Sequence, residues 1–146
     1  MKRNAFTLME LMVGMVIIAV TTTVIIANVD ALGGQTAKRE AEKLAHWLTT
    51  LMTIADSRND GFTLTINANV PTIEWASSHP LSPNTKKFEE ASEGCSFRLT
   101  APNGKLEYRV QTNNFTQGGH ITVTGKGASH KVVIATIGSR INVEKI

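Results

Sequence analysis

The first sixty residues contain two hydrophobic patterns with different spacing. Residues 6–29 read FTLMELMVGMVIIAVTTTVIIANV, and the nineteen residues at positions 11–29 carry no formal charge. A helix needs about 20 such residues to cross a hydrocarbon core of about 30 Å. We therefore predict that residues 6–29 form a membrane-inserted helix, which contains a single acid, Glu10.

The second pattern has the period of an amphipathic helix. Between residues 35 and 60, apolar residues recur at steps of three and four: Ala37, Ala41, Leu44, Ala45, Leu48, Leu51, Met52 and Ala55. Charged residues lie between them, which is typical of a helix with one buried face. Residues 30–60 are therefore predicted to continue the first helix and to pack their apolar side on a sheet.

Three places are candidates for a break in this long helix. Residues 21–24 are β-branched and lose side-chain freedom in a helix. They are either a soft point that loosens on assembly or plain helix with hydroxyls packed against neighbours, and both interpretations stay open. Gly33 and Gly34 form a second weak point. The turn at residues 59–61 is predicted to end the helix, with Gly61 supplying a positive φ angle.

The remaining residues, 61–146, alternate between apolar and polar positions and contain frequent turn signals. We predict short strands at residues 62–66, 72–75, 96–100, 106–111, 120–124, 131–136 and 140–143. A turn at residues 69–71 joins the first two, and residues 79–94 are predicted to be a surface loop. Residues 96–100 and 106–111 are predicted to pair as a hairpin across Pro102, Asn103 and Gly104. The expected fold class is α+β: a long N-terminal helix packed on an antiparallel sheet that is twisted or split in two.

A short basic leader, MKRNA, precedes the apolar segment. An ordinary secretory signal places its small-residue cleavage site after the apolar run, whereas here the small residue Ala5 comes before it. Cleavage between Ala5 and Phe6 would leave the helix on the mature protein. Lys2 and Arg3 would keep the short flank cytoplasmic, so the C-terminal domain would be exported.

The run FTLMEL resembles the FTLIEL hallmark of type IV prepilins and type II secretion pseudopilins. The resemblance implies a leader at residues 1–5 removed by prepilin peptidase, N-methylation of the new terminus at Phe6, and a pilin-like fold with domains at 6–29, 30–60 and 61–146. Two departures are Ala5, where the family usually has Gly, and the lack of a proline in the middle of the helix.

The C-terminal pattern GGHITVTGKGASHKVVIATIGSRINV resembles the end of the GspH/FimT family of minor pseudopilins and minor pilins. In that family, glycine-separated strands close on a strand that contains Gly and Arg. The matching residues are Gly138, Ser139 and Arg140, with a serine interposed. This second resemblance covers about 25 residues and indicates a minor rather than a major subunit.

Glu10 has a physical cost that needs an explanation. A carboxylate within a membrane helix costs about 2.5 to 3.5 kcal/mol, so such a group normally has a partner. The resemblance implies that this partner is the amine of Phe6 on a neighbouring subunit, which would fix the stagger of the helices. The alternative is that Glu10 lies at the headgroup boundary, solvated and unpaired.

Composition excludes several other functions. The net charge of +3 falls to +1 when Lys2 and Arg3 are removed, so it is a weak argument for a nucleic-acid partner. The lone Cys95 cannot form an internal disulfide and is predicted to be buried. The sequence has no glycine-rich phosphate loop, and its four histidines are scattered. We therefore expect no enzyme activity, no cofactor and no metal site.

A DNA-binding surface is a second hypothesis. Lys126, Lys131, Arg140 and Lys145, with His130, could line one edge of the C-terminal sheet and neutralise phosphates. Glu144 interrupts this set, and the region lacks the aromatic residues on which single strands stack. A DNA-binding minor pilin for natural transformation therefore stays open as an alternative function.

The expected function is that of a minor pseudopilin or minor pilin, a structural subunit that acts in fibre assembly or at the fibre tip. The resemblance implies a single-pass protein of the inner membrane. Its implied partners are other pilins or pseudopilins, prepilin peptidase, the inner-membrane assembly platform and membrane lipid. The alternatives are the DNA-binding function and a membrane-tethered domain without an assembly role. Type II secretion, a type IV pilus and a competence pilus are not distinguished.

Overall fold

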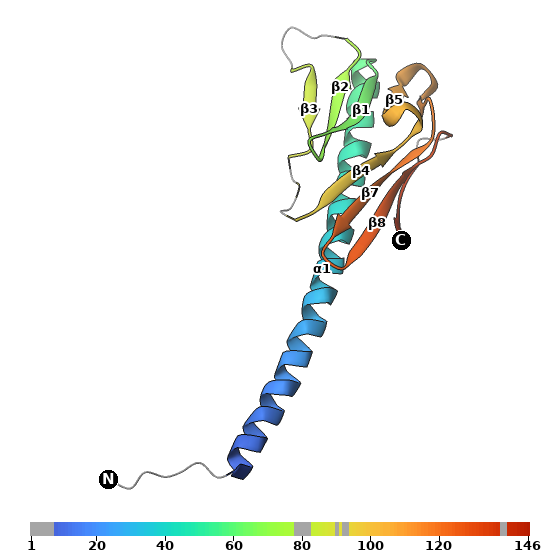
Figure 1. Cartoon of the computed structure of the whole chain (residues 1–146). Coiled ribbons are helices and arrows are strands. Elements are labelled where there is room, and N and C mark those ends of the chain that lie inside the picture. The colour runs from blue at the N-terminus through green and yellow to red at the C-terminus, as the bar shows by residue number, and fades with distance from the viewer. Residues whose placement is uncertain (1–7, 78–82, 90, 92–93, 138–139) are drawn as a thin grey trace.

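The long helix is the axis of the molecule. A computed structural model describes residues 8–77, 83–89, 91, 94–137 and 140–146, with the side chains of residues 8, 10 and 22–34 left out. Helix α1 spans Leu8–Arg58, 51 residues or roughly 75 Å, without a break at the predicted weak points. Its first half projects from the domain and its second half is covered by sheets (Figure 1). The Thr21 hydroxyl donates to the Ile17 carbonyl oxygen at 2.8 Å, so it bonds within the helix.

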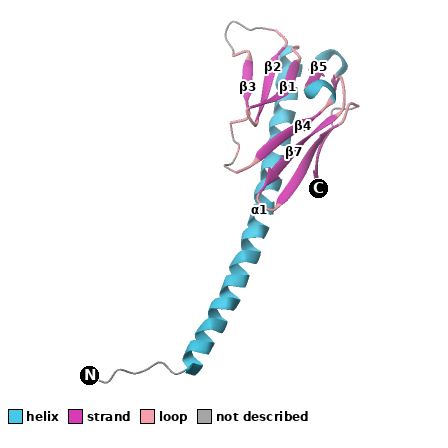
Figure 2. Ribbon diagram, in the orientation of Figure 1, coloured by secondary structure: helices cyan, strands magenta, loops and turns pink. Residues whose placement is uncertain are grey.

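Two antiparallel sheets form the rest of the domain (Figure 2). The first has the order β3-β2-β1-β5-β6, with β1 Phe62–Asn67, β2 Val70–Trp75, β3 Thr85–Lys87, β5 Leu106–Arg109 and β6 Asn114–Phe115. The second has the order β4-β7-β8-β9, with β4 Ser96–Thr100, β7 Gly119–Gly125, β8 Ala128–Ile134 and β9 Ile141–Lys145. Short 3₁₀ turns lie at Pro102–Gly104 and Val110–Thr112. The expected α+β fold with a split sheet is confirmed.

The core lies between the second half of α1 and both sheets. Six residues of the predicted stripe are at most 1% exposed: Ala37, Ala41, Leu44, Leu48, Leu51 and Ala55. Across the first sheet, the register aligns Trp75, Phe62, Tyr108 and Phe115 as one row of aromatic rings. Neighbouring rings in this row lie 5.2 to 5.7 Å apart, a spacing at which aromatic pairs attract. The stripe prediction is therefore confirmed.

The predicted hairpin between residues 96–100 and 106–111 is wrong. β4 pairs with β7, where Phe97 faces Val123, and β5 pairs with β1, where Tyr108 faces Phe62. The two strands belong to different sheets, and the Pro102–Gly104 turn carries the chain from one to the other. A turn motif reports local backbone preference only, whereas burial of both inward faces decides which strands pair.

The prediction of a surface loop at residues 79–94 is wrong in part. β3 lies within this range and pairs with β2. The residue after it, Phe88, is 2% exposed, and its ring lies 5.4 Å from Trp47 and 5.9 Å from Phe97. One aromatic side chain thus ties an otherwise polar segment to the helix and to the second sheet.

Two predicted turns differ in detail. The turn between β1 and β2 is at Ala68 and Asn69, which both have positive φ, while Pro71 lies within β2 opposite Ile66. The helix ends at Arg58; the next residue, Asn59, has a φ of 53°, and Gly61 does not have positive φ. Asparagine tolerates this left-handed conformation better than most residues, so a glycine is not required for it.

Candidate functional site

The first half of α1 presents apolar side chains to its surroundings. Nine of them are 52 to 76% exposed: Met9, Leu11, Met12, Val13, Met15, Val16, Ile17, Ile18 and Val20. Runs of consecutive residues belong to this set, so the apolar side chains surround the helix instead of forming one stripe. A helix that is apolar all round is normally buried in lipid or against other chains. We define residues 9–20 as the apolar rod.

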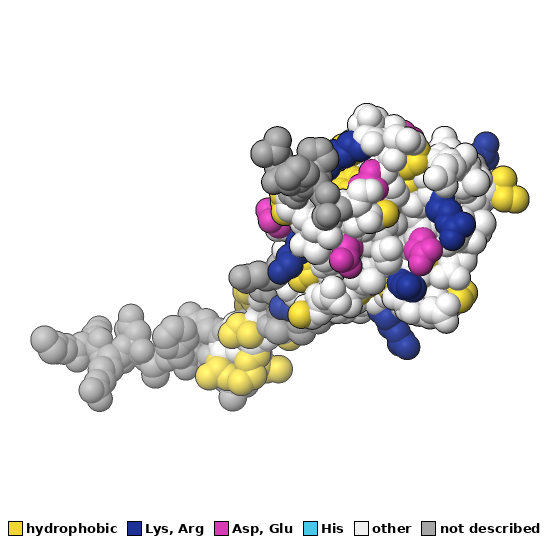
Figure 3. Space-filling view, turned by 90° about the horizontal axis from the view of Figure 1, so that it is seen from above, with side chains coloured by type: hydrophobic (Ala, Val, Ile, Leu, Met, Phe, Trp, Pro, Cys, Tyr) yellow, Lys and Arg dark blue, Asp and Glu magenta, His cyan; other side chains and the backbone are white. Residues whose placement is uncertain are grey.

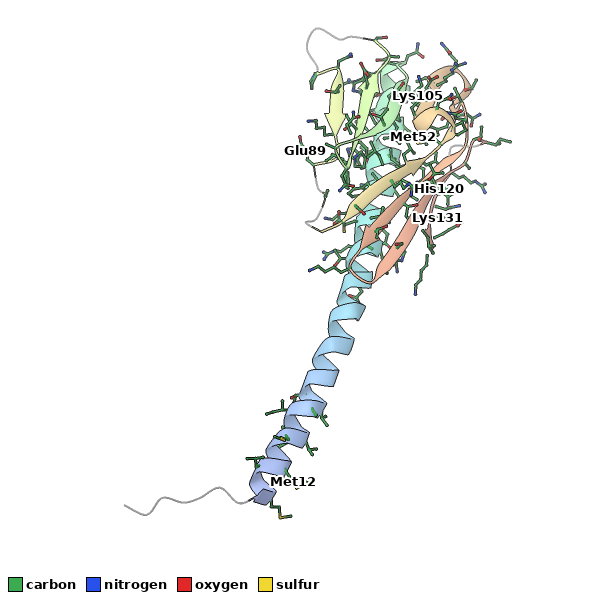
Figure 4. The ribbon with its side chains drawn as sticks, in the orientation of Figure 1. Met12, Met52, Glu89, Lys105, His120 and Lys131 are labelled. Atoms are coloured by element: carbon green, nitrogen blue, oxygen red, sulfur yellow. The ribbon has the colours of Figure 1, made fainter. Side chains whose placement is uncertain are left out.

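The contrast with the second half of α1 is visible in the figures. Hydrophobic atoms gather on the projecting helix, whereas charged side chains are scattered over the domain (Figure 3). Met12 lies near the free end of the helix with no other element beside it (Figure 4). Within the described part of the chain, burial begins at Ala37. The sheets therefore cover one half of α1 and leave the apolar rod bare.

The predicted assembly and processing residues lie at the start of this rod. Glu10 belongs to the first turn of α1 between the exposed residues Met9 and Leu11, and its side chain is not among those described. Ala5 and Phe6 fall outside the described residues. Cleavage at Ala5, methylation of Phe6 and the pairing of Glu10 therefore stay predictions.

Among the described residues, no helical segment qualifies as long and apolar enough for a membrane span.

The basic residues proposed for DNA lie on both faces of the second sheet. Lys145 stands opposite His130, whose side chain is 6% exposed and faces inward. Lys131 is the next residue along β8 and therefore points to the outer face, where it stands opposite Glu144. The register thus places Lys131 and Lys145 on different faces of the sheet.

The other two basic residues lie at opposite ends of β8. Lys126 is in the turn before this strand and Arg140 follows it, roughly 20 Å away along seven residues. Sequence reasoning missed Arg98, which shares an outer-face row with Thr122 and Lys131. The alternation of polar residues in β4 indicated that Arg98 faces outward. Its place beside Thr122 and Lys131 was not predictable, because it depends on the pairing of β4 with β7. The four proposed residues are not gathered along one edge, and DNA binding stays a prediction.

No group of three or more potential metal ligands occurs among the residues that the structure describes. The predicted burial of Cys95 is confirmed. Desolvation raises the pKa of its thiol, and the negative charge of Glu40 adds to this effect. The thiol is therefore held in its neutral form, which is a poor nucleophile and a poor metal ligand.

Comparison with known proteins found one match to the start of the sequence and one to the fold. Residues 1–26 match the family described as the prokaryotic N-terminal methylation motif. Among solved structures, the minor pseudopilin EpsH from the type 2 secretion system of Vibrio cholerae matches with a TM-score of 0.52 and 16% sequence identity. The match covers 75% of this chain and 96% of that one. The chain resembles a minor pseudopilin. No curated protein sequence matches it.

The two findings concern different parts of the pseudopilin resemblance. The motif covers residues 1–26, which include the whole apolar rod, and the structural likeness concerns the fold. Together they confirm the resemblance to type IV pilin-like proteins and the pilin-like α+β fold. In this chain, α1 carries both the bare apolar rod and a half that is buried in the domain.

Proposed function

We propose that this protein is a minor pseudopilin or minor pilin that acts as a structural subunit of a fibre and not as an enzyme. The proposal rests on the observation that one chain combines a prepilin motif, a bare apolar rod and a pilin-like fold. The subunit would enter the inner membrane once, lose residues 1–5 to prepilin peptidase and be methylated at Phe6. An assembly platform would then move it from lipid into a staggered bundle of helices.

The apolar rod accounts for insertion and bundling but not for register. Burying one Val, Leu, Ile or Met side chain is worth about 1.5 to 3 kcal/mol relative to water. Lipid tails and neighbouring helices provide nearly the same apolar surroundings, so this term does not distinguish one from the other. A specific polar contact is therefore needed to select one arrangement of subunits.

Glu10 is proposed to supply that contact. Its carboxylate would pair with the terminal amine of Phe6 on a neighbouring subunit, so that each charge neutralises the other in an apolar environment. A misplaced subunit would leave both charges unpaired, which is far more costly inside a bundle than in water. The pair would thus favour a single stagger of the helices.

Processing is tested by mass spectrometry of the protein purified from a bacterium that has prepilin peptidase. The expected mature chain begins at Phe6 and carries one N-methyl group. A variant with Ala5→Leu, which enlarges the residue at the cleavage site, is expected to stay uncleaved and to keep the leader, residues 1–5. An intact Met1 in the parent protein, or a cut after residue 27, would contradict the proposal.

Assembly is tested with Glu10→Leu and Glu10→Ala. Both variants should be cleaved normally but should enter sheared fibres at least about tenfold less than the parent, since the register contact is lost. Glu42→Ala is the matched control, because Glu42 makes only an exposed ion pair with Lys38 at 3.7 Å. Equal incorporation of the Glu10 variants and the parent would overturn the assignment.

A further inference from the structure

A groove of about 500 Å³ lies beside β3, on the side of the first sheet that faces the end of α1. Ile54 and Arg58 of the helix line it, together with Trp75 of β2 and Pro83. Figure 1 shows β3 as the outer strand of this sheet, on the side away from the second sheet. The groove is thus open next to a sheet edge.

The edge itself has backbone groups available for pairing. In the described part of the chain, β3 pairs only with β2. Trp75 donates to the Asn84 carbonyl and Phe88 donates to the Pro71 carbonyl, both at 2.9 Å. Because hydrogen-bonded positions alternate in antiparallel pairs, Asn84, Lys86 and Phe88 bond to β2.

Thr85 and Lys87 therefore direct their amide and carbonyl groups away from the sheet. These two residues could bond to an added strand without disturbing β2, in the manner of peptides that extend an exposed sheet. Each would contribute one donor and one acceptor. A partner strand of only three or four residues would satisfy all four groups.

The surroundings of this edge are basic. Arg58, Lys86 and Lys87 line the groove, and Glu89 is the one acid among its described lining residues. The guanidinium of Arg58 lies 5.2 Å from the centre of the Trp75 ring, a cation–π contact that holds it over the groove. Lys86 stands opposite Ile73 and shares its groove-facing side, while Lys87 points to the outer face. The outer face is mixed in charge, because the exposed Glu74 stands opposite Thr85 there, so an anionic group is favoured on the groove side of an added strand.

Edge protection is the competing explanation of these lysines. Lysine on a short edge strand discourages pairing between sheets and prevents aggregation. That role explains Lys86 and Lys87 but requires neither the groove nor the positioned Arg58. On the groove side it also opposes only neutral and basic strands, because carboxylates there would meet Arg58 and Lys86.

We propose that β3 binds an extended acidic segment of a neighbouring fibre subunit by strand addition. The backbone groups of Thr85 and Lys87 bond to this segment. Its carboxylates contact Arg58 and Lys86 on the groove side. The inference rests on the proposed function for the identity of the partner, whereas binding itself requires no fibre.

The binding test uses the full chain in detergent micelles and a fluorescein-labelled ten-residue peptide of alternating Glu and Val. Fluorescence anisotropy is expected to show saturable binding that weakens as salt is added. Lys86→Glu combined with Lys87→Glu should weaken it at least about tenfold. Lys126→Glu combined with Lys145→Glu makes the same change of charge on the other sheet, so it should leave binding within about twofold.

The backbone contacts are tested separately with Thr85→Pro. This change removes an outward N–H but no bond to β2, and edge strands tolerate proline at such positions. Binding should fall at least about fivefold, whereas Thr85→Ala keeps the N–H and should bind like the parent. Circular dichroism checks that each variant is folded.

Three results would overturn the inference. They are the absence of peptide binding, equal binding of a peptide that alternates Lys and Val, and an equal effect of Thr85→Ala and Thr85→Pro. Binding of a single-stranded ten-nucleotide DNA that the β3 variants abolish, without peptide binding, would assign the groove to a different ligand. Failure of the Glu10 experiment would leave peptide binding intact, so the two proposals fail separately.

Discussion

The hydroxyl of Tyr108 lies 2.8 Å from the carboxylate oxygen Oδ1 of Asp56. Tyr108 belongs to β5 and Asp56 to the last turn of α1, so this hydrogen bond ties the first sheet to the end of the helix. The same hydroxyl lies 2.6 Å from the amide oxygen of Asn113. The ring is 2% exposed and stacks on Phe62 at 5.2 Å, which fixes the direction in which the hydroxyl points.

Tyr108→Phe should lower the free energy of unfolding by about 1.5 kcal/mol, within the range of about 1.5 to 3 kcal/mol for a hydrogen bond to a charged group. The loss stays at the lower end of the range because Asp56 is exposed and water can solvate it in the variant. Urea unfolding of the full chain in detergent, followed by tryptophan fluorescence, measures the change. Thr49→Ala removes only an exposed bond within the helix and should change the stability by less than about 0.5 kcal/mol.

Tyr108 also predicts how the stability depends on alkaline pH. Its burial raises the pKa of the phenol well above the ordinary value, and the hydrogen bond to Asp56 and the charge of Asp56 raise it further. A phenol whose pKa is higher in the folded chain stabilises the fold below the unfolded pKa of about 10 and loses that effect as the pH rises. The parent should therefore lose stability more steeply than Tyr108→Phe above about pH 10. If the free energies of unfolding of the two proteins changed equally with pH between pH 8 and 11, this prediction would be contradicted.

Phe88→Ala should be strongly destabilising although the residue lies in a segment with a polar sequence. The change removes a buried ring from contact with Trp47 and Phe97 and leaves a cavity, which costs about 3 to 5 kcal/mol. Ile137→Ala, at an 84% exposed position, should be nearly neutral. Thermal unfolding of both variants is measured by circular dichroism. If Phe88 were merely part of an exposed loop, both variants would have the same midpoint.

Gly61→Ala should destabilise the fold by about 1 to 3 kcal/mol, because its new methyl group would lie 2.5 Å from the Tyr108 carbonyl oxygen. The neighbouring Asn59→Gly change should have little effect or stabilise slightly, since glycine adopts the left-handed conformation of Asn59 without strain. Urea midpoints of the two variants measure the contrast. Equal urea midpoints for the parent and Gly61→Ala would show that the close approach to the Tyr108 carbonyl does not restrict this position.

Parts of the candidate site follow from local sequence alone. The nineteen uncharged residues that follow Glu10 predict an apolar helix of membrane length, because such a helix needs about 20 of them. The apolar stripe from Ala37 to Ala55 predicts a buried helix face, because the direction of a side chain around a helix depends only on its position along the chain. The basic groove beside β3 was not predictable, since Arg58 and Lys86 are 28 positions apart and meet only through the pairing of β3 with β2.

The pattern of amino acids was enough to predict the helix, its apolar and amphipathic halves, the positions of most strands and the prepilin-like start. These features depend on the period of apolar residues and on short motifs, which act over a few residues. The tertiary structure alone decided that β4 and β5 enter different sheets, that Phe88 closes the core, and that Tyr108 meets Asp56. Each of these contacts joins segments far apart in the chain, and its stability comes from burying surfaces that no local pattern specifies.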